Sequence, residues 1–170
     1  RFGRAGVCAP ARRDTFVAQM TDGGRFVVLG PGHLQSLMAI ERCSFTSPWS
    51  EGDFLYFFAD GSSLCQGLVQ SGELVAYALG YCEGQDFHLA SLAVELESRR
   101  RGYASRLLQQ LLLQAQRRGA DRCTLEVRAA NRAALMLYDK TGFRSLEVRT
   151  AHYSGPRDDG IIMERSIEIL

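Results

Sequence analysis

The sequence predicts an α/β protein, and three observations carry that prediction. The chain has 170 residues, 46% of them hydrophobic and 23% charged, which is enough for one well-buried core in an ordinary globular composition. Its second half alternates strand-like and helix-like segments, the pattern of a sheet covered by helices. One of these segments, residues 102–119, has apolar residues at nearly every position that an amphipathic helix requires.

We expect one domain. No internal repeat appears, and no linker suggests a second domain. Residues 1–24 show no sustained hydrophobic period, so we interpret them as an N-terminal extension or a loosely attached segment. Residues 25–170 are then the single folded domain.

The first half of this domain is expected to contribute strands and two helices. Short apolar runs bounded by turn residues predict strands at Arg25–Leu29, Leu64–Gln70, Leu74–Tyr81 and Phe87–Val94. An approximate apolar stripe predicts a helix over His33–Cys43. Ser50, followed by two acidic residues in the next turn, predicts the N-cap of a second helix.

The second half is more regular. The helix of residues 102–119 has its apolar positions at Ala104, Leu107, Leu108, Leu111, Leu112 and Ala115. Gly119 ends that helix. The remaining elements are expected to be a strand at Cys123–Arg128, a helix capped by Asn131 and ended by Gly142, and strands at Phe143–Arg149 and Ile161–Ile167.

Charge and cysteine usage exclude several classes of protein. The net charge is +1, so no global field draws the chain to nucleic acid or to a membrane, and no apolar run is long enough to span one. The five cysteines are scattered and never form C-x-x-C. We therefore expect reduced thiols in a cytoplasmic protein, and neither a metal site nor a disulfide framework.

The stretch "ESRRRGYASRLLQQLL" concentrates arginines where a helix begins. A helix N-terminus already carries unpaired N–H groups and the positive end of the helix dipole, so these arginines indicate an anionic ligand such as a phosphate. The stretch is not a P-loop, and it has only one glycine of a dinucleotide-binding motif. A solvated basic loop or a small RNA-binding patch remains an alternative on these residues alone.

Two further blocks give the stretch a context. "LASLAV" followed by Arg99-x-x-Gly102-x-Ala104 resembles the acetyl-coenzyme A signature of the GNAT superfamily of N-acetyltransferases. "LEVRAANRAALMLYDKTGF" is similar to the corresponding block of the RimI-type ribosomal-protein alanine N-acetyltransferases within that superfamily. "FTSPWS" and "DDGIIMERSI" resemble the entry segment and the closing strand of the same family.

The resemblance covers roughly residues 25–167. It implies a mixed, mostly antiparallel sheet of about seven strands, flanked by about four helices, whose central strands splay apart to admit the pantetheine arm of acetyl-CoA. Acetyl-CoA is then the co-substrate, and no metal is expected. The residues that the resemblance assigns to cofactor binding are Leu92, Ala93, Val94, Arg99, Arg100, Arg101, Gly102, Tyr103, Ala104, Ser105 and Asn131. A free N–H at Val94 is the expected oxyanion donor.

Two residues are expected to carry catalysis. Glu126 is the candidate base, acting directly or through a water, because it stands in mid-strand on the face opposite its apolar neighbours. Spacing alone favours a simple ion pair between Glu126 and Arg128, and the resemblance reverses that preference. Tyr138 is the candidate acid for the departing thiolate, although a lone tyrosine on a helix is usually packing.

Other candidates are weaker. Cys123 faces the apolar side of its strand and is interpreted as a core residue. His88 and His152 are poor candidates for the base, because the sequence shows nothing that would orient either ring.

The acceptor is the least defined part. By the resemblance, Phe45, Pro48, Trp49 and Tyr153 contact a protein N-terminus, possibly that of an alanine-initiated ribosomal protein. The family has paired tyrosines where this chain has His152-Tyr153, and its Asp-Pro and second loop glycine are replaced by Glu95-Leu96 and by Ala104. We expect a monomer or weak homodimer that contacts neither nucleic acid nor membrane. Acetylation of lysine or a small amine, and a non-catalytic CoA- or RNA-binding module, are the competing hypotheses.

Overall fold

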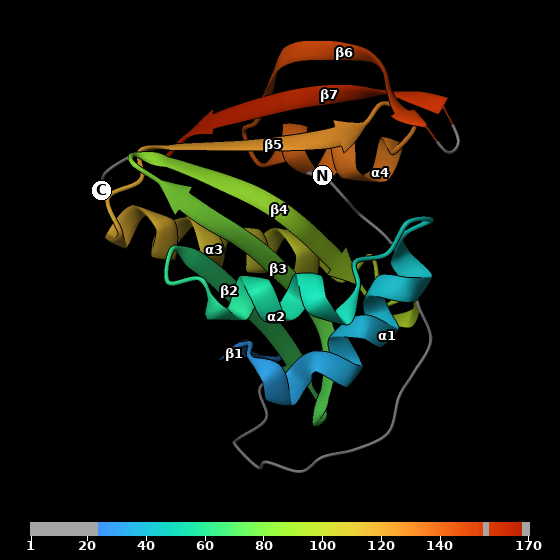
Figure 1. Cartoon of the computed structure of the whole chain (residues 1–170), viewed down its shortest axis with the longest axis vertical. Helices are drawn as coiled ribbons and strands as arrows, with labels where there is room; N and C mark the ends of the chain where they lie inside the picture. The colour runs from blue at the N-terminus through green and yellow to red at the C-terminus, as the bar shows by residue number, and fades with distance from the viewer. Residues whose placement is uncertain (1–23, 155–156, 168–170) are drawn as a thin grey trace.

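A seven-stranded mixed sheet forms the centre of the protein in the computed structural model, which describes residues 24–154 and 157–167 (Figure 1). The strands are β1 (Arg25–Val28), β2 (Ser63–Gln70), β3 (Glu73–Glu83), β4 (Asp86–Val94), β5 (Arg122–Arg128), β6 (Arg144–Ser154) and β7 (Arg157–Ser166). They lie in the order β1-β2-β3-β4-β5-β7-β6, and every neighbouring pair is antiparallel except β4 and β5. The predicted fold class is confirmed, whereas the segment expected at 1–24 lies, apart from Gly24, outside the described residues.

Four helices cover the sheet. They are α1 (Leu34–Ser44), α2 (Glu51–Ala59), α3 (Tyr103–Arg117) and α4 (Arg132–Lys140), and short 3-10 turns occupy Pro31–His33 and Leu96–Ser98. In Figure 1, α1 and α2 lie over one face of the strands β2 to β4, and α3 lies over the opposite face. No helix in the described part of the chain is long and apolar enough to cross a membrane.

Two predicted helix caps are present. The backbone N–H of Asp53 donates to Ser50 Oγ (3.2 Å) and the Ser50 N–H donates to Asp53 Oδ2 (2.8 Å), which completes a capping box. At α4, the N–H of Ala134 donates to Asn131 Oδ1 (3.1 Å). Local sequence therefore sets the start of both helices.

The last hairpin is longer than the sequence predicted. β6 was expected to end at Arg149 and instead runs to Ser154, and β7 begins at Arg157 rather than Ile161. Residues 150–154 have no alternating apolar pattern, so pairing with β7 holds this extension. The register between the two strands shifts between Arg149 and Tyr153.

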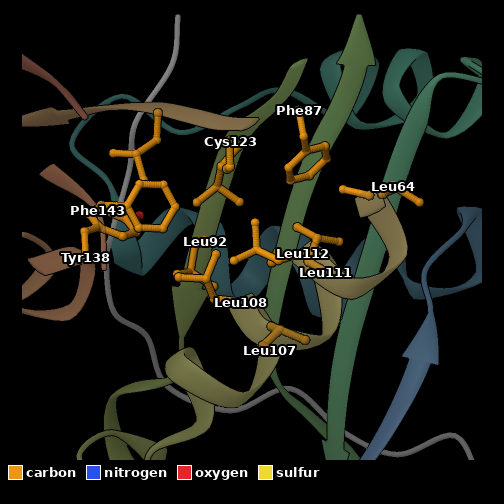
Figure 2. Close-up of a cluster of buried hydrophobic side chains, with 14 of the residues drawn as sticks. Leu64, Phe87, Leu92, Leu107, Leu108, Leu111, Leu112, Cys123, Tyr138 and Phe143 are labelled. Atoms are coloured by element: carbon orange, nitrogen blue, oxygen red, sulfur yellow. The ribbon is translucent and has the colours of Figure 1, made fainter. Parts of the chain in front are cut away.

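A separate apolar core lies on each face of the sheet. Figure 2 shows the larger one, where Leu107, Leu108, Leu111 and Leu112 of α3 pack with residues of the sheet and α4. On the other face, Leu37 and Ile40 of α1 and Phe54 of α2 pack against buried side chains of β3 and β4. The sheet is thus covered on both sides, and its central strands are buried.

The cysteines divide into two groups. Cys65, Cys82 and Cys123 carry free thiols, and burial raises the pKa of all three, to about 12 at Cys65. Cys43 is disulfide-bonded. The expectation of reduced thiols is therefore correct at three of the described cysteines and wrong at Cys43.

Candidate active site

The site begins where β4 and β5 separate. Only Asp86–Leu89 of β4 pairs with β5, with Arg122–Leu125, and beyond this point the two strands diverge (Figure 1). The register between β3 and β4 shifts at the same place: Leu79 faces Ser91 whereas Gly80 faces Leu89, so Ala90 is the extra residue of a β-bulge. A bulge bends its strand, and this one turns β4 away from β5.

Gly80 makes this bend possible. A Cβ atom at that position would lie 2.6 Å from the carbonyl oxygen of His88 and would also collide with the Phe87 ring. Only glycine allows β3 to approach β4 so closely beside the bulge.

The freed edge of β4 presents backbone groups to the gap. The N–H of Glu95 donates to the Val75 carbonyl (2.8 Å), and hydrogen-bonded pairs alternate along an antiparallel ladder. Val94, the residue before Glu95, therefore directs its backbone N–H away from β3, and so does Leu92, two residues before Val94. This agrees with the free N–H expected at Val94.

The N-terminus of α3 faces the same region with its backbone groups uncapped. Gly102 occupies the N-cap position with a φ of 78° and supplies no side-chain cap, and the first turn contains no acidic residue. Arg100 also has a positive φ, 62°, which is strained for a residue with a Cβ. A loop held in this conformation in front of unpaired N–H groups is suited to bind a phosphate.

A cavity of about 430 Å³ joins these features. It is lined by Leu92, Ala93, Val94, Ser98, Arg99, Arg100, Gly102, Tyr103, Ala104, Ser105, Asn131, Ala133, Ala134, Met136, Leu137 and Lys140. Ten of the eleven residues predicted to bind the cofactor are in this lining. Arg101 is the exception, because it is exposed and does not line the cavity.

One wall of the cavity was not predicted. Ala133, Met136, Leu137 and Lys140 stand at positions i, i+3, i+4 and i+7 of α4, so they form one helix face. Met136 is 67% exposed, unusual for a large apolar side chain, and that face provides an apolar surface beside the gap. The helical spacing in the sequence could have identified this wall.

The charge of the lining is positive. Arg99, Arg100 and Lys140 line the cavity, and none of the described lining residues is acidic. Arg99 Nε donates to the Val94 carbonyl (3.3 Å), which fixes the start of the loop to the end of β4. The cavity therefore combines an apolar channel with a positively charged end, as a long anionic ligand requires.

Glu126 lies at the point of separation, as the first residue of β5 beyond the last paired position, Leu125. The carboxylate is buried, with His152 Nε2 at 2.8 Å from Oε1 and Arg149 Nη1 at 3.6 Å from Oε2. His152 Nε2 is in ion-pair contact with Oε1, and this oxygen accepts no hydrogen bond from the described residues. Pairing with Arg128 does not occur, since that guanidinium lies over the Tyr153 ring, 3.9 Å from its centroid.

Tyr138 is almost completely buried, and its ring packs against Phe143 with the centroids 5.6 Å apart (Figure 2). It does not itself line the cavity, although the neighbouring Leu137 does. Burial, with a smaller contribution from Cys123, raises the pKa of Tyr138. The phenol therefore keeps its proton near neutral pH, as a proton donor must.

The remaining candidates are placed as follows. Cys123 is fully buried, as expected for a core residue. His88 shares a hydrogen bond with Thr124 Oγ1 (2.7 Å) and stacks on Tyr81. His152 is a weak candidate for the base on sequence alone, because no neighbour in the sequence would orient its ring. The structure places Glu126 beside it, brought there by a pairing between β5, β7 and β6 that the sequence pattern does not reveal.

The predicted acceptor residues come from two segments. The Trp49 ring packs between Phe54 and Phe57, with ring centroids at 5.4 and 5.1 Å, and the backbone N–H of Trp49 donates to Glu41 Oε1 (2.7 Å). Phe45 is half-buried and Pro48 is exposed in the same segment. Tyr153 lies in β6, in edge contact with His152.

Comparison with known proteins decides the family. The model described as "Acetyltransferase (GNAT) family" matches residues 34–143, which is more than half of the chain. The protein belongs to the GNAT acetyltransferase family. The [Ribosomal protein bS18]-alanine N-acetyltransferase of Escherichia coli K12 is 33% identical over 132 residues, which cover 76% of this chain and 88% of that protein.

Solved structures agree with this assignment. The crystal structure of the ribosomal-protein-S18-alanine N-acetyltransferase from Escherichia coli matches with a TM-score of 0.80 and 30% identity, over 86% of this chain and 96% of that one. Arabidopsis thaliana NAA60, solved in complex with acetyl-CoA, has the same fold, with a TM-score of 0.77 and 20% identity over 84% of this chain and 98% of its own.

The protein is therefore an acetyl-CoA-dependent N-acetyltransferase. The residues that line the cavity fit that co-substrate. The uncapped start of α3 provides backbone donors for a pyrophosphate, and the gap beside β4 is long and mostly apolar.

Proposed function

We propose that this acetyltransferase acetylates the N-terminal α-amine of a protein, and that the acceptor is a ribosomal protein beginning with alanine. Relatives with that stated activity match nearly their full length at about one-third identity, which supports the acceptor class. The observation that carries the proposal is the separation of β4 from β5, with Glu126 at its apex and the start of α3 at its far end.

Donor binding is assigned to the cavity lining. The backbone N–H groups of Tyr103, Ala104 and Ser105 bind the pyrophosphate, and Arg100 adds positive charge beside them. The backbone of residues 92–94 pairs with the pantetheine amides as an added strand would, and Asn131 closes the other side. Arg101, which lies outside the lining, contributes only charge at longer range.

The catalytic roles follow from position. The Val94 N–H stabilises negative charge on the thioester oxygen, an interaction worth roughly 3–4 kcal/mol in enzymes from which such a donor was removed. Glu126 provides the basic group that draws a proton from the acceptor amine. Tyr138 donates a proton to the sulfur that leaves. It lies one helical turn after Ala134, which lines the cavity, so the two residues share a face of α4, and this supports that role.

The acceptor binds on the face of the sheet that carries α1 and α2. Glu126 belongs to this face, because its strand neighbours Leu125 and Val127 pack into the opposite core. We assign one wall of the acceptor site to Phe45, Pro48 and Trp49, and the other wall to Tyr153. A free α-amine has an ordinary pKa near 8 against about 10.4 for lysine, so it is easier to deprotonate near neutrality.

The test uses three peptides of the same sequence and mass spectrometry to locate the acetyl group. One begins with a free alanine, one has a blocked N-terminus and a free internal lysine, and one begins with a bulky residue. We expect acetylation of the first peptide alone, on its α-amine. Equal reaction of the blocked peptide would overturn the α-amine assignment in favour of lysine.

A second measurement separates the enzyme from a binding module. Titration with acetyl-CoA should raise the Tm, as any ligand that binds only the folded state does, whereas titration with a short RNA should not. A shift with RNA and none with acetyl-CoA would contradict the assignment of the cavity to the donor.

A further inference from the structure

We propose that His152 is a catalytic residue, whose imidazole takes the proton from the acceptor amine while Glu126 acts as its positioning partner. This inference deepens the proposed function and rests on it. It assigns the contact with the amine to a histidine–carboxylate pair instead of to the carboxylate alone.

Exposure decides which of the two groups an amine can reach. The Glu126 side chain is 5% exposed, and its Oε1 atom is fully buried. The His152 side chain is 38% exposed, and its Nε2 lies 2.8 Å from that oxygen. An amine that approaches from solvent therefore meets the imidazole before it can meet Oε1.

The pair is built into the sheet through Gly160. This residue of β7 lies between β5 and β6 and pairs with Arg128 on one side and Arg149 on the other. A Cβ atom there would lie 2.9 Å from Glu126 Oε1 and 3.3 Å from His152 Cβ. The missing side chain lets the carboxylate and the imidazole meet across β7.

The Arg149 guanidinium contacts Oε2 of Glu126 and leaves Oε1 to His152. Arg149 Nη1 approaches Oε2 at 3.6 Å, and the same guanidinium is held by Glu147 through Nε (3.3 Å). On the other side of the imidazole, the ring of Tyr153 makes an edge contact at 5.1 Å and carries the Arg128 guanidinium on its face. These are the charged and titratable groups that face the pair from β5 and β6.

The two ring nitrogens then have different roles. With Nε2 directed to Glu126, Nδ1 is left for the substrate, and it has no hydrogen-bond partner among the residues that the structure describes. A carboxylate at one nitrogen fixes the tautomer, so the other nitrogen presents its lone pair.

The proton balance is simple. Nδ1 accepts a proton from the acceptor ammonium, and the nitrogen lone pair forms a bond to the thioester carbonyl carbon. The carbon–sulfur bond breaks, and the thiolate takes a proton from Tyr138. The nitrogen of the tetrahedral intermediate then loses its second proton, which passes through solvent to the tyrosinate and restores Tyr138. Overall, an ammonium and a thioester give an amide, a thiol and one proton, and His152 releases that proton to solvent.

Steady-state kinetics of His152→Gln test the proposal. We expect kcat to fall about 100-fold or more, the loss typical of a missing general base, with the KM for acetyl-CoA unchanged. The acidic limb of the pH–rate profile should disappear. Added imidazole should restore part of the activity of His152→Ala, which no structural role of the side chain explains.

Two comparisons sharpen this result. His88→Gln is the matched control. It removes an imidazole that shares a hydrogen bond with Thr124, a residue of the same strand as Glu126, and its kcat should stay within about threefold of wild type. The variant with both His152→Gln and Glu126→Gln should be no slower than His152→Gln alone, since the two residues act as one unit. A His152→Gln enzyme with near wild-type kcat and an intact acidic limb would overturn the proposal and return Glu126 to direct contact with the amine.

The outcome of these kinetic tests does not depend on which acceptor the enzyme prefers, because they use whichever amine the wild-type enzyme acetylates fastest. NMR gives a reading that needs no acceptor at all. The ring ¹⁵N signals of His152 should move in Glu126→Gln at fixed pH and stay in place in Glu147→Gln, which alters only the partner of Arg149. Unmoved signals in both variants would show that the pair does not exist in solution.

Discussion

Arg122 donates two hydrogen bonds to Asp86, from Nε at 2.6 Å and from Nη2 at 2.9 Å, across the first residue pair between β4 and β5. The pair lies at the closed end of the gap, where the two strands still form a ladder. The hydrogen bond from Arg122 lowers the pKa of Asp86. Only three further residue pairs separate this ion pair from the point where the strands diverge.

Asp86→Asn should therefore make the protein slightly less stable near neutral pH. A carboxylate whose pKa is lower in the folded state stabilises the fold above its unfolded value of about 3.9, and the contribution disappears as the pH falls through the folded value. We expect a small decrease in Tm at pH 7 that is lost as the pH falls through and below the folded-state pKa of Asp86, measured by thermal denaturation at several pH values. An unchanged difference across that range would contradict the assignment.

Gly102→Val should raise the KM for acetyl-CoA by about tenfold or more. A left-handed φ costs a residue with a Cβ roughly 1–2 kcal/mol, so the loop relaxes and its N–H groups lose their direction. Gly119→Val is the matched control, because Gly119 ends the same helix with a φ of 91° and an equally open surrounding, and does not line the cavity. We expect both variants to lose a similar amount of Tm, and only Gly102→Val to show a higher KM for acetyl-CoA. An equal rise of KM in both variants would contradict the phosphate site.

Tyr138→Phe should slow thiolate departure while leaving acetyl-CoA affinity within about twofold. The change removes only the hydroxyl and preserves the packing on Phe143. We expect a kcat loss of roughly 100-fold with acetyl-CoA. An acetyl thioester of an acidic aryl thiol, whose thiolate leaves without a proton, should show a much smaller loss. Equal losses with the two thioesters would return Tyr138 to a packing role.

Leu108→Ala should destabilise the protein by about 2–5 kcal/mol, the usual cost of emptying a fully buried leucine site. Leu113→Ala on the same helix is the control, because that side chain is 41% exposed and its loss should cost much less. Urea denaturation measures both. Similar free energies of unfolding for the two variants would contradict the assignment of the larger core to this face of α3.

Local signals in the sequence were enough for most of the architecture. The amphipathic spacing of α3, the caps at Ser50 and Asn131 and the glycine at 102 act over a few residues, so they can be read without the fold. The mixed, splayed sheet came from the family resemblance, and the structure confirms it. The loop and strand that line the cavity were predicted from local sequence signals together with the family resemblance.

Contacts between distant strands were not predictable in the same way. The meeting of Glu126 and His152 depends on the order β5-β7-β6 and on a glycine opposite both, and neither leaves a periodic pattern in the sequence. The extension of β6 to Ser154 has the same cause, since pairing with β7 and not its own composition makes it a strand. Arg101 does not line the cavity, and three adjacent arginines in a sequence do not show which of them faces it.

The single extra residue at Ala90 has a mechanical consequence. It leaves the sheet in two portions, one of β1, β2, β3 and β4 and one of β5, β7 and β6. The two portions are joined by a ladder of four residue pairs and by the helices packed across them. Such a seam is the natural place for the molecule to open locally, and amide exchange there should be faster than in either portion. A donor molecule that binds along β4 occupies the place of the missing strand contacts. Binding of acetyl-CoA therefore also holds the two portions of the sheet together.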